Sequence, residues 1–139
     1  MSGEPWGPEA IRSLAVTGED VVAAVETNRT TDREAVLRVT PPFSGRMRAR
    51  LHVVKAEDDD ATVHVPPTAL VESPPAYPTP DVTADELRAR EDDDYSVERH
   101  RQYHERRVDE WRATLLDHVV DSLTHPAVDH DIEVTVLGT

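Results

Sequence analysis

The sequence predicts an α+β fold, in which an antiparallel sheet of about four strands is packed on one face by helices. Apolar residues alternate with polar ones in residues 34–55 and again in 132–136, and they recur at helical spacing through residues 96–125. With 139 residues the chain has the size of one domain, so we expect a single domain over residues 1–139. Glycine and proline in residues 1–8 predict a disordered lead-in.

The N-terminal elements are a short strand and a short helix. Residues 11–16 are apolar enough for a strand. Thr17 precedes an acidic turn and is expected to cap a helix that ends near Asn28. Three valines at positions 21, 22 and 25 form one apolar stripe on this helix, which we expect to pack against the sheet.

The central element is a hairpin over residues 34–55. Its two strands, 34–40 and 46–55, are joined by a connection too short for a crossover, so they should pair antiparallel. The second strand alternates Met47, Ala49, Leu51 and Val53 with Arg46, Arg48, Arg50 and His52. Because strand side chains point alternately to opposite faces, one face should meet the core while the other carries the cations.

A third strand is expected at residues 61–65, ended by two prolines. The following residues 66–82 are rich in proline and predict a surface linker inside the domain. Thr83 and Glu86 have the spacing of a capping box, which predicts a short helix to about Arg90.

The longest predicted element is a C-terminal helix that begins after Ser96, a residue suited to its N-cap. Its apolar stripe consists of Val97, His104, Val108, Trp111, Leu115, Val119 and Leu123. Pro126 predicts a helix end near His125. We expect this long helix to cover the same sheet face as the short N-terminal helix, and residues 132–136 to form the last strand.

The charge balance predicts a protein adapted to concentrated salt. The chain has 28 acidic and 15 basic residues, a net charge of −13, and only one basic residue, Lys55, is a lysine. High net charge keeps molecules apart, and at about 1 M salt the Debye length of roughly 3 Å screens the resulting self-repulsion. A GC-rich genome would also favour arginine codons, but it does not require so many acids. We therefore expect a halophilic, cytoplasmic protein.

Several classes of function find no support in the sequence. The absence of cysteine excludes disulfides, thiolate catalysis and cysteine-ligated metals. The N-terminus lacks the pattern of a secretory signal, and no apolar run approaches the ~20 residues of a membrane span. P-loop, dinucleotide-binding and nucleophile-elbow motifs are missing. The sequence thus assigns no catalytic residue and no cofactor, and an enzyme is not favoured.

One basic region interrupts the acidic chain. Residues 41–55 hold four basic residues and no acid, whereas residues 56–98 hold thirteen acids and two arginines. The candidate anion- or partner-binding residues on one sheet face are Arg38, Arg46, Arg48, Arg50, His52 and His64. Guanidinium groups fit phosphate or carboxylate oxygens bidentately. The alternative is internal neutralisation of this face by Glu133 or by the acidic run at 57–60.

A second candidate site is the pair His100 and His104. Histidines four residues apart on a helix can reach one metal ion, although the zinc-protease order H-E-x-x-H is absent. A third ligand would have to come from elsewhere, with His52 or His64 as the candidates. The alternative is that both histidines simply extend the packing face of the helix.

Residues 35–52, residues 95–101 and the helix around Trp111 together resemble a family of small uncharacterised proteins of halophilic archaea. The resemblance covers most of the chain and implies a domain of unknown function. It supports the halophilic interpretation and implies no catalytic residue.

These observations favour a non-enzymatic binding module that uses its arginine-rich sheet face. A protein partner or a small anionic ligand is favoured, while the net charge of −13 and the salt sensitivity of phosphate contacts disfavour nucleic acid. The alternative hypothesis is a metal-binding protein or metal-dependent enzyme centred on His100 and His104.

Overall fold

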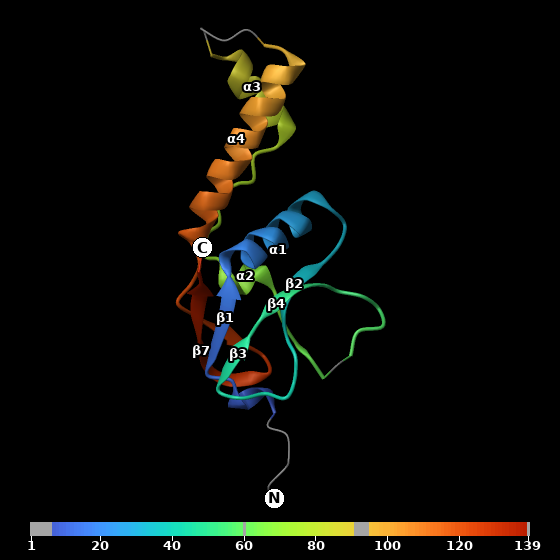
Figure 1. Cartoon of the computed structure of the whole chain (residues 1–139), viewed down its shortest axis with the longest axis vertical. Coiled ribbons are helices and arrows are strands. Elements are labelled where there is room, and N and C mark those ends of the chain that lie inside the picture. The colour runs from blue at the N-terminus through green and yellow to red at the C-terminus, as the bar shows by residue number, and fades with distance from the viewer. Residues whose placement is uncertain (1–6, 60, 91–94, 139) are drawn as a thin grey trace, which may run out of the picture. The chain divides into compact units, whose positions relative to one another are not determined.

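The computed structural model describes residues 7–59, 61–90 and 95–138 (Figure 1). The chain divides into two compact units, Met1–Glu72 with Val119–Thr139 and Ser73–His118. Most of the predicted lead-in at 1–8 lies outside the described residues. Where the description begins, a short 3-10 helix η1 (Pro8–Ala10) precedes the first strand.

The first unit contains a mixed sheet, sheet A, with the strand order β3-β1-β7-β6. Its strands are β1 (Ser13–Thr17), β3 (Arg46–Arg48), β6 (Ser122–His125) and β7 (Val128–Leu137). Strand β1 is parallel to both of its neighbours, whereas β6 and β7 are antiparallel.

A second, antiparallel sheet, sheet B, has the order β4-β2-β5. It consists of β2 (Ala35–Val39), β4 (Arg50–Val53) and β5 (Val63–Val65). The predicted hairpin 34–55 is present as the β2–β4 pair. The prediction of one antiparallel sheet is wrong in its detail, because the strands form two sheets and one of them is mixed.

The reason is a change of sheet within the predicted strand 46–55. Residue Ala49 lies between β3 and β4, is fully buried, and donates its backbone N–H to the carbonyl of Ala15 at 3.0 Å. The small alanine side chain allows the backbone to pass closely over β1 at this point. One arginine-bearing stretch therefore supplies an edge strand to each sheet.

Helix α1 (Gly18–Thr30) begins at its predicted cap, since the Thr17 hydroxyl accepts the N–H of Asp20 at 3.1 Å. Its buried valines face the core, and it packs against β1, β2 and β4, as expected for the short helix. The segment predicted as a linker, 66–82, carries the one-turn helix α2 (Pro67–Leu70) at its start. Helix α2 also packs on the core, where Leu70 is fully buried.

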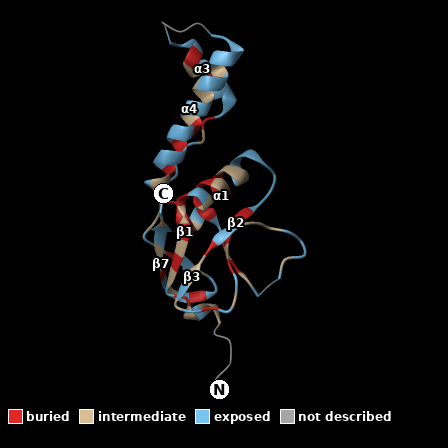
Figure 2. Cartoon of the chain, viewed as in Figure 1, coloured by how far each residue is buried: buried red, intermediate tan, exposed pale blue. Residues whose placement is uncertain are grey.

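The second unit consists of α3 (Pro80–Arg88), α4 (Val97–Leu116) and the extended chain before them. Helix α4 starts at the predicted cap Ser96, whereas α3 is capped by Thr79, so the prediction that Thr83 caps it is wrong. The long helix, expected on the sheet, packs against α3 within its own unit. Figure 2 shows it largely exposed, with buried positions recurring at intervals along the helix.

The long helix ends at Leu116, earlier than predicted. The backbone N–H of Val120 donates to the carbonyl of Leu70 at 2.8 Å and Val119 forms a bridge with Val71, so both valines have backbone partners in the first unit. Leu123, predicted on the helical stripe, is a buried residue of β6. Among the described helices, none has the length and apolar character required to cross a bilayer.

Candidate functional site

The six residues predicted on one face fall on both sheets of the first unit. In sheet A, Arg46 lies opposite Ser13 and Arg48 opposite Ala15. In sheet B, Arg38 has Arg50 as its neighbour on one side and His64 on the other, and His52 lies opposite Val36. The register therefore brings Arg38, Arg50, His52 and His64 to one face of sheet B.

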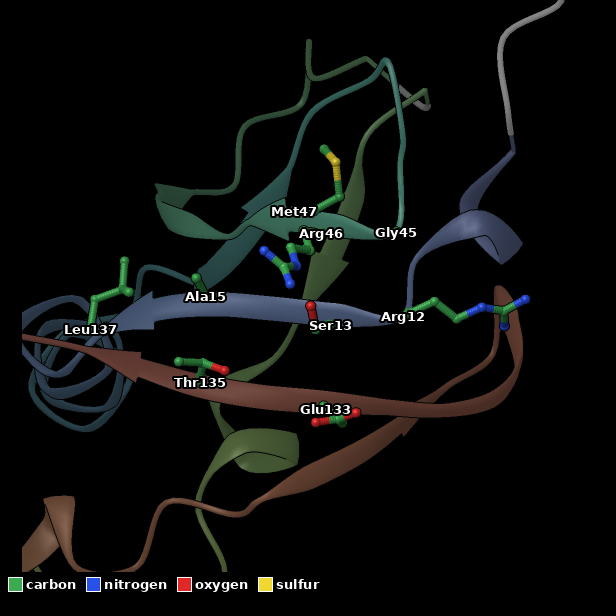
Figure 3. Close-up of a pocket in the computed structure, with 9 residues that line it drawn as sticks. All are labelled: Arg12, Ser13, Ala15, Gly45, Arg46, Met47, Glu133, Thr135 and Leu137. Atoms are coloured by element: carbon green, nitrogen blue, oxygen red, sulfur yellow. The ribbon is translucent and has the colours of Figure 1, made fainter.

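Sheet A carries a shallow pocket of about 690 Å³ along β1 (Figure 3). Its floor is made by the short side chains of Ser13 and Ala15, while Arg46 lies on one side and Glu133 with Thr135 on the other. This groove forms because β1 has small side chains here, whereas β3 and β7 on either side of it have longer ones. The Arg12 side chain extends away from the floor, and its guanidinium lies 2.8 Å from Nδ1 of His130.

Among the residues that the structure describes, the arginines of the face have no carboxylate as an ion-pair partner. Within the part of the chain that the structure describes, Arg38, Arg46, Arg48 and Arg50 form no ion pair. Glu133, the expected partner, lies across β1 from Arg46, about two strand spacings or ~9.6 Å away. The Nε of Arg48 is buried and has no hydrogen-bond partner among the described residues.

Sheet B also brings two of these cations together. Arg38 and Arg50 are directly paired in the antiparallel register of β2 and β4. Side chains opposite each other on one face lie close, and like charges there are destabilising. A bound anion would relieve this repulsion.

A separate polar cluster on the same face of sheet B consists of His52, Asp58 and His64. Nε2 of His52 lies 2.7 Å from Oδ2 of Asp58, and the two histidine rings are 5.6 Å apart. One potential ligand atom from each of the three residues lies within 4.8 Å of the others, and all three are half-buried. Nη1 of Arg38 is 3.5 Å from His52 Nε2.

The path of the chain explains how this cluster forms. Both β4 and β5 are antiparallel to β2 and lie on opposite sides of it, so their connection must return along β2. Val36 lies on the same face of sheet B as His52 and is buried. The described part of the connection passes over this face and brings Asp58 to His52. Of the acidic run 57–60, which was weighed as an internal neutralising group for this face, Asp58 does lie against it. Asp60 of the same run lies outside the described residues.

The Asp58 carboxylate is held in its ionised form. The backbone N–H of Lys55 donates to Oδ2 at 2.8 Å, and this hydrogen bond, followed by the one with His52, lowers the pKa of Asp58 below its ordinary value. The backbone of His64 is fixed as well, because its carbonyl accepts Nε2–H of His125 at 2.9 Å. His125 in turn accepts the N–H of Ala127 on Nδ1, which sets its tautomer.

The predicted pair His100 and His104 has a different environment, in the second unit. Nε2 of His100 and Nδ1 of His104 each lie 2.9 Å from the hydroxyl of Thr83, which is fully buried. Among the described residues no third metal-ligating side chain joins this pair. The arrangement ties α3 to α4, which matches the packing alternative.

Comparison with known proteins assigns the chain to a family. The sequence profile described as Domain of unknown function (DUF8009) matches residues 1–138. The chain belongs to this family. No curated protein and no solved structure gives a match.

For this DUF8009 chain, sequence reasoning identified the cations and weighed the acidic run 57–60 as their neighbour, but it did not single out Asp58 within that run. An acidic run normally predicts a solvated loop, and the only available indication was the placement of that run between two histidine-bearing strands. Arg12 was also missed, because one isolated arginine before a strand gives no pattern to interpret.

Proposed function

We propose that this protein is a non-enzymatic binding module that receives an acidic segment of a protein partner along Arg46, Arg48 and Arg50, the arginine row. The observation that carries the proposal is the direct pairing of Arg38 with Arg50, neither of which forms an ion pair in the described part of the chain. The carboxylate of Asp58 on this face is engaged by His52 and by the backbone N–H of Lys55. A surface that opposes like charges loses stability unless an anion binds there.

The spacing of the row suits an extended chain. Arg46 and Arg48 are alternate residues of β3, and alternate strand residues are about 6.6–6.8 Å apart, the distance between alternate side chains of a second extended segment. Arg50 follows beyond Ala49, in β4 of sheet B. The neighbouring groove on sheet A adds apolar contacts, because Ala15, Met47 and Leu137 line it beside Arg46. Such apolar contacts maintain the affinity for the partner in concentrated salt, which screens the ionic contacts.

Nucleic acid fits this surface less well. Glu133 lies at the wall of the groove, and the chain as a whole has a net charge of −13. Both features repel a continuous phosphate backbone, and phosphate contacts weaken steeply as salt rises.

A titration with a defined acidic probe tests the proposal. A labelled hexaglutamate peptide is followed by fluorescence anisotropy with the wild-type protein and with Arg50→Gln. We expect Arg50→Gln to lower the affinity by about tenfold or more, because it removes a charge-assisted contact. Arg29→Gln is the matched control, since Arg29 is exposed on α1, outside the row.

Two outcomes separate the alternatives. Equal affinity of wild type and Arg50→Gln contradicts the binding row. Tight binding of pyrophosphate with no binding of hexaglutamate replaces the acidic segment by a small phosphorylated ligand.

We also propose that the protein works in the cytoplasm of a halophilic archaeon. The support is compositional: 28 acids, a single lysine, and thirteen of the acids within residues 56–98. In dilute buffer these carboxylates repel one another, so the melting temperature should be higher in ~2 M KCl than in low salt. A melting temperature that is unchanged or lower in KCl contradicts halophilic adaptation.

A further inference from the structure

We propose that His52, Asp58 and His64 form a site for one divalent transition-metal ion of the zinc type. The three side chains come from β4, from the connection that follows it and from β5, so two of them stand on strands of sheet B. Two imidazoles and one carboxylate are a donor set that such ions bind well, and three protein ligands leave a further position open.

The distances require only small adjustments. The donor atoms lie within 4.8 Å of one another, and His52 Nε2 is 2.7 Å from Asp58 Oδ2. Around a tetrahedral ion with bonds of about 2.0–2.1 Å, neighbouring ligand atoms are ~3.3 Å apart. Side-chain rotations that displace the donor atoms by a few tenths of an ångström up to about 1.5 Å bring these separations to the tetrahedral value without moving the strands.

The convergence of the two histidines is itself unusual for a sheet. His52 lies opposite Val36 and His64 opposite Arg38, on the two sides of β2, so their backbones are separated by two strand spacings and by two residues along β2, roughly 12 Å in all. Their ring centroids are nevertheless 5.6 Å apart, so both rings lean over β2. Their positions are supported by the neighbouring hydrogen bonds, from Lys55 N–H to Asp58 and from His125 to the carbonyl of His64.

The cluster is sheltered but can be reached. The side chains of His52 and Asp58 are 14% and 16% exposed, which removes most competing water from the donors. A pocket of about 490 Å³, lined by Asp58, His64 and His125 among others, borders the cluster. The open coordination position would face this pocket, where water or an anionic ligand group can enter.

The Arg38 guanidinium, 3.5 Å from His52 Nε2, is the feature that opposes a cation. Its charge weakens the affinity for the free ion and favours an anion as the additional ligand, since the anion would contact both the metal and Arg38. Metal binding therefore goes beyond the proposed acidic-segment binding, and Arg50 takes no part in it.

The test is a titration of the full chain, without an affinity tag, with Co²⁺ and Zn²⁺. Co²⁺ reports its coordination through visible absorption, and Zn²⁺ is followed by calorimetry and by the melting temperature. We expect one equivalent to bind, with the absorption of a four- or five-coordinate ion and a raised melting temperature. Asp58→Asn and His64→Gln should each lower the affinity by at least about tenfold.

Two control variants make the result decisive. Arg38→Gln removes a charge but no ligand, and we expect it to bind the metal at least as tightly as wild type. The double variant His100→Gln/His104→Gln changes the other histidine pair and should bind one equivalent with unchanged affinity. All variants are compared by circular dichroism, so that a lost fold is distinguished from a lost ligand.

Three results would overturn the proposal. The first is less than one equivalent of metal bound at about 1 mM free metal, because a dissociation constant this weak indicates incidental binding. The second is unchanged affinity in folded Asp58→Asn and His64→Gln, and the third is loss of binding only in the His100/His104 variant. Failure of the hexaglutamate titration leaves this test unaffected, because that titration depends on Arg50 and this one on Asp58.

Discussion

The arginines of the sheets and those of helix α4 are the same side chain in opposite surroundings. On α4, Arg101 pairs with Glu98 and Glu105, and Arg107 pairs with Glu86 of α3 at 2.9 Å. The arginine row of β3 and β4 has no such partner in the described residues. The arginines of α4 are neutralised by carboxylates of their own unit, whereas those of the row are open to charged groups of a binding partner.

The geometry of the two elements explains the difference. Helix neighbours are three and four residues apart, and at those distances α4 places acids next to its arginines. Strand neighbours on one face are two residues apart, and in the row these neighbours are again arginines. Across the strand pair, Arg50 meets Arg38. A strand with this sequence cannot neutralise itself, whereas the helix can.

The histidines show the same contrast. His100 and His104 contact a hydroxyl within their unit, whereas His52 and His64 surround an ionised carboxylate beside a pocket. The histidine pair of the second unit thus contacts a buried hydroxyl, whereas the cluster of the first unit borders a pocket that a ligand can enter.

The largest effect is expected from Thr83→Val in the second unit. Thr83 is fully buried and contacts both His100 and His104 at 2.9 Å, so the change leaves two imidazoles without this partner. We expect a loss of about 1–3 kcal/mol in the free energy of unfolding. Denaturant unfolding followed by Trp111 fluorescence, in a Trp6→Phe background, measures it.

Thr114→Val is the matched control for this change, because Thr114 is exposed on the same helix α4 and threonine and valine have similar helix propensities. It should leave the free energy of unfolding nearly unchanged. If Thr83→Val is as stable as wild type, the histidine pair does not depend on internal hydrogen bonds, and the contrast between the two pairs is lost.

The elements predicted correctly from sequence are those defined by local chemistry. Thr17 and Ser96 cap helices because a side-chain oxygen three residues before a free amide suffices to do so. The pairing of β2 with β4 follows from neighbouring apolar alternation. Both depend on residues close in sequence.

The features that sequence could not reveal depend on distant partners. Ala49 looks like any inward-facing strand residue, and only the parallel pairing of β3 with β1 makes it a crossing point. Leu123 fits the spacing of the helix stripe as well as a strand, and β7 decides in favour of the strand. Asp58 reaches His52 only because the β4–β5 connection crosses sheet B.

A smaller effect, of opposite sign, is expected from Arg50→Gln in the first unit. Because Arg50 faces Arg38 without a carboxylate partner in the described chain, its neutralisation removes a repulsion. We expect the ligand-free protein to gain roughly 0.2–1 kcal/mol, measured by denaturant unfolding in low salt. The gain should shrink in concentrated KCl, where the repulsion is screened. Arg29→Gln should give no gain, and a destabilised Arg50→Gln protein would mean that Arg50 has a structural role.

The smallest effect is expected from the ion pair between Glu86 and Arg107 and depends on pH. The hydrogen bond from Arg107, and then that from Tyr103, lowers the pKa of Glu86 below its ordinary value of 4.5. A carboxylate with a lower pKa in the folded state binds fewer protons there than in the unfolded chain. Its contribution is therefore complete above pH 4.5 and is lost as the pH falls through the folded-state pKa.

The difference in unfolding free energy between wild type and Glu86→Gln measures this contribution. It should be constant at roughly 0–1 kcal/mol from neutral pH to about pH 5, and should fall towards zero in more acidic buffer. Glu105→Gln is the control: it faces Arg101 on the exposed side of α4, where solvent screens the pair, so it should show little difference at any pH. A Glu86→Gln difference that grows on acidification would show that the carboxylate is not held in its charged form. The second unit would then lack the internal neutralisation that distinguishes it from the arginine row.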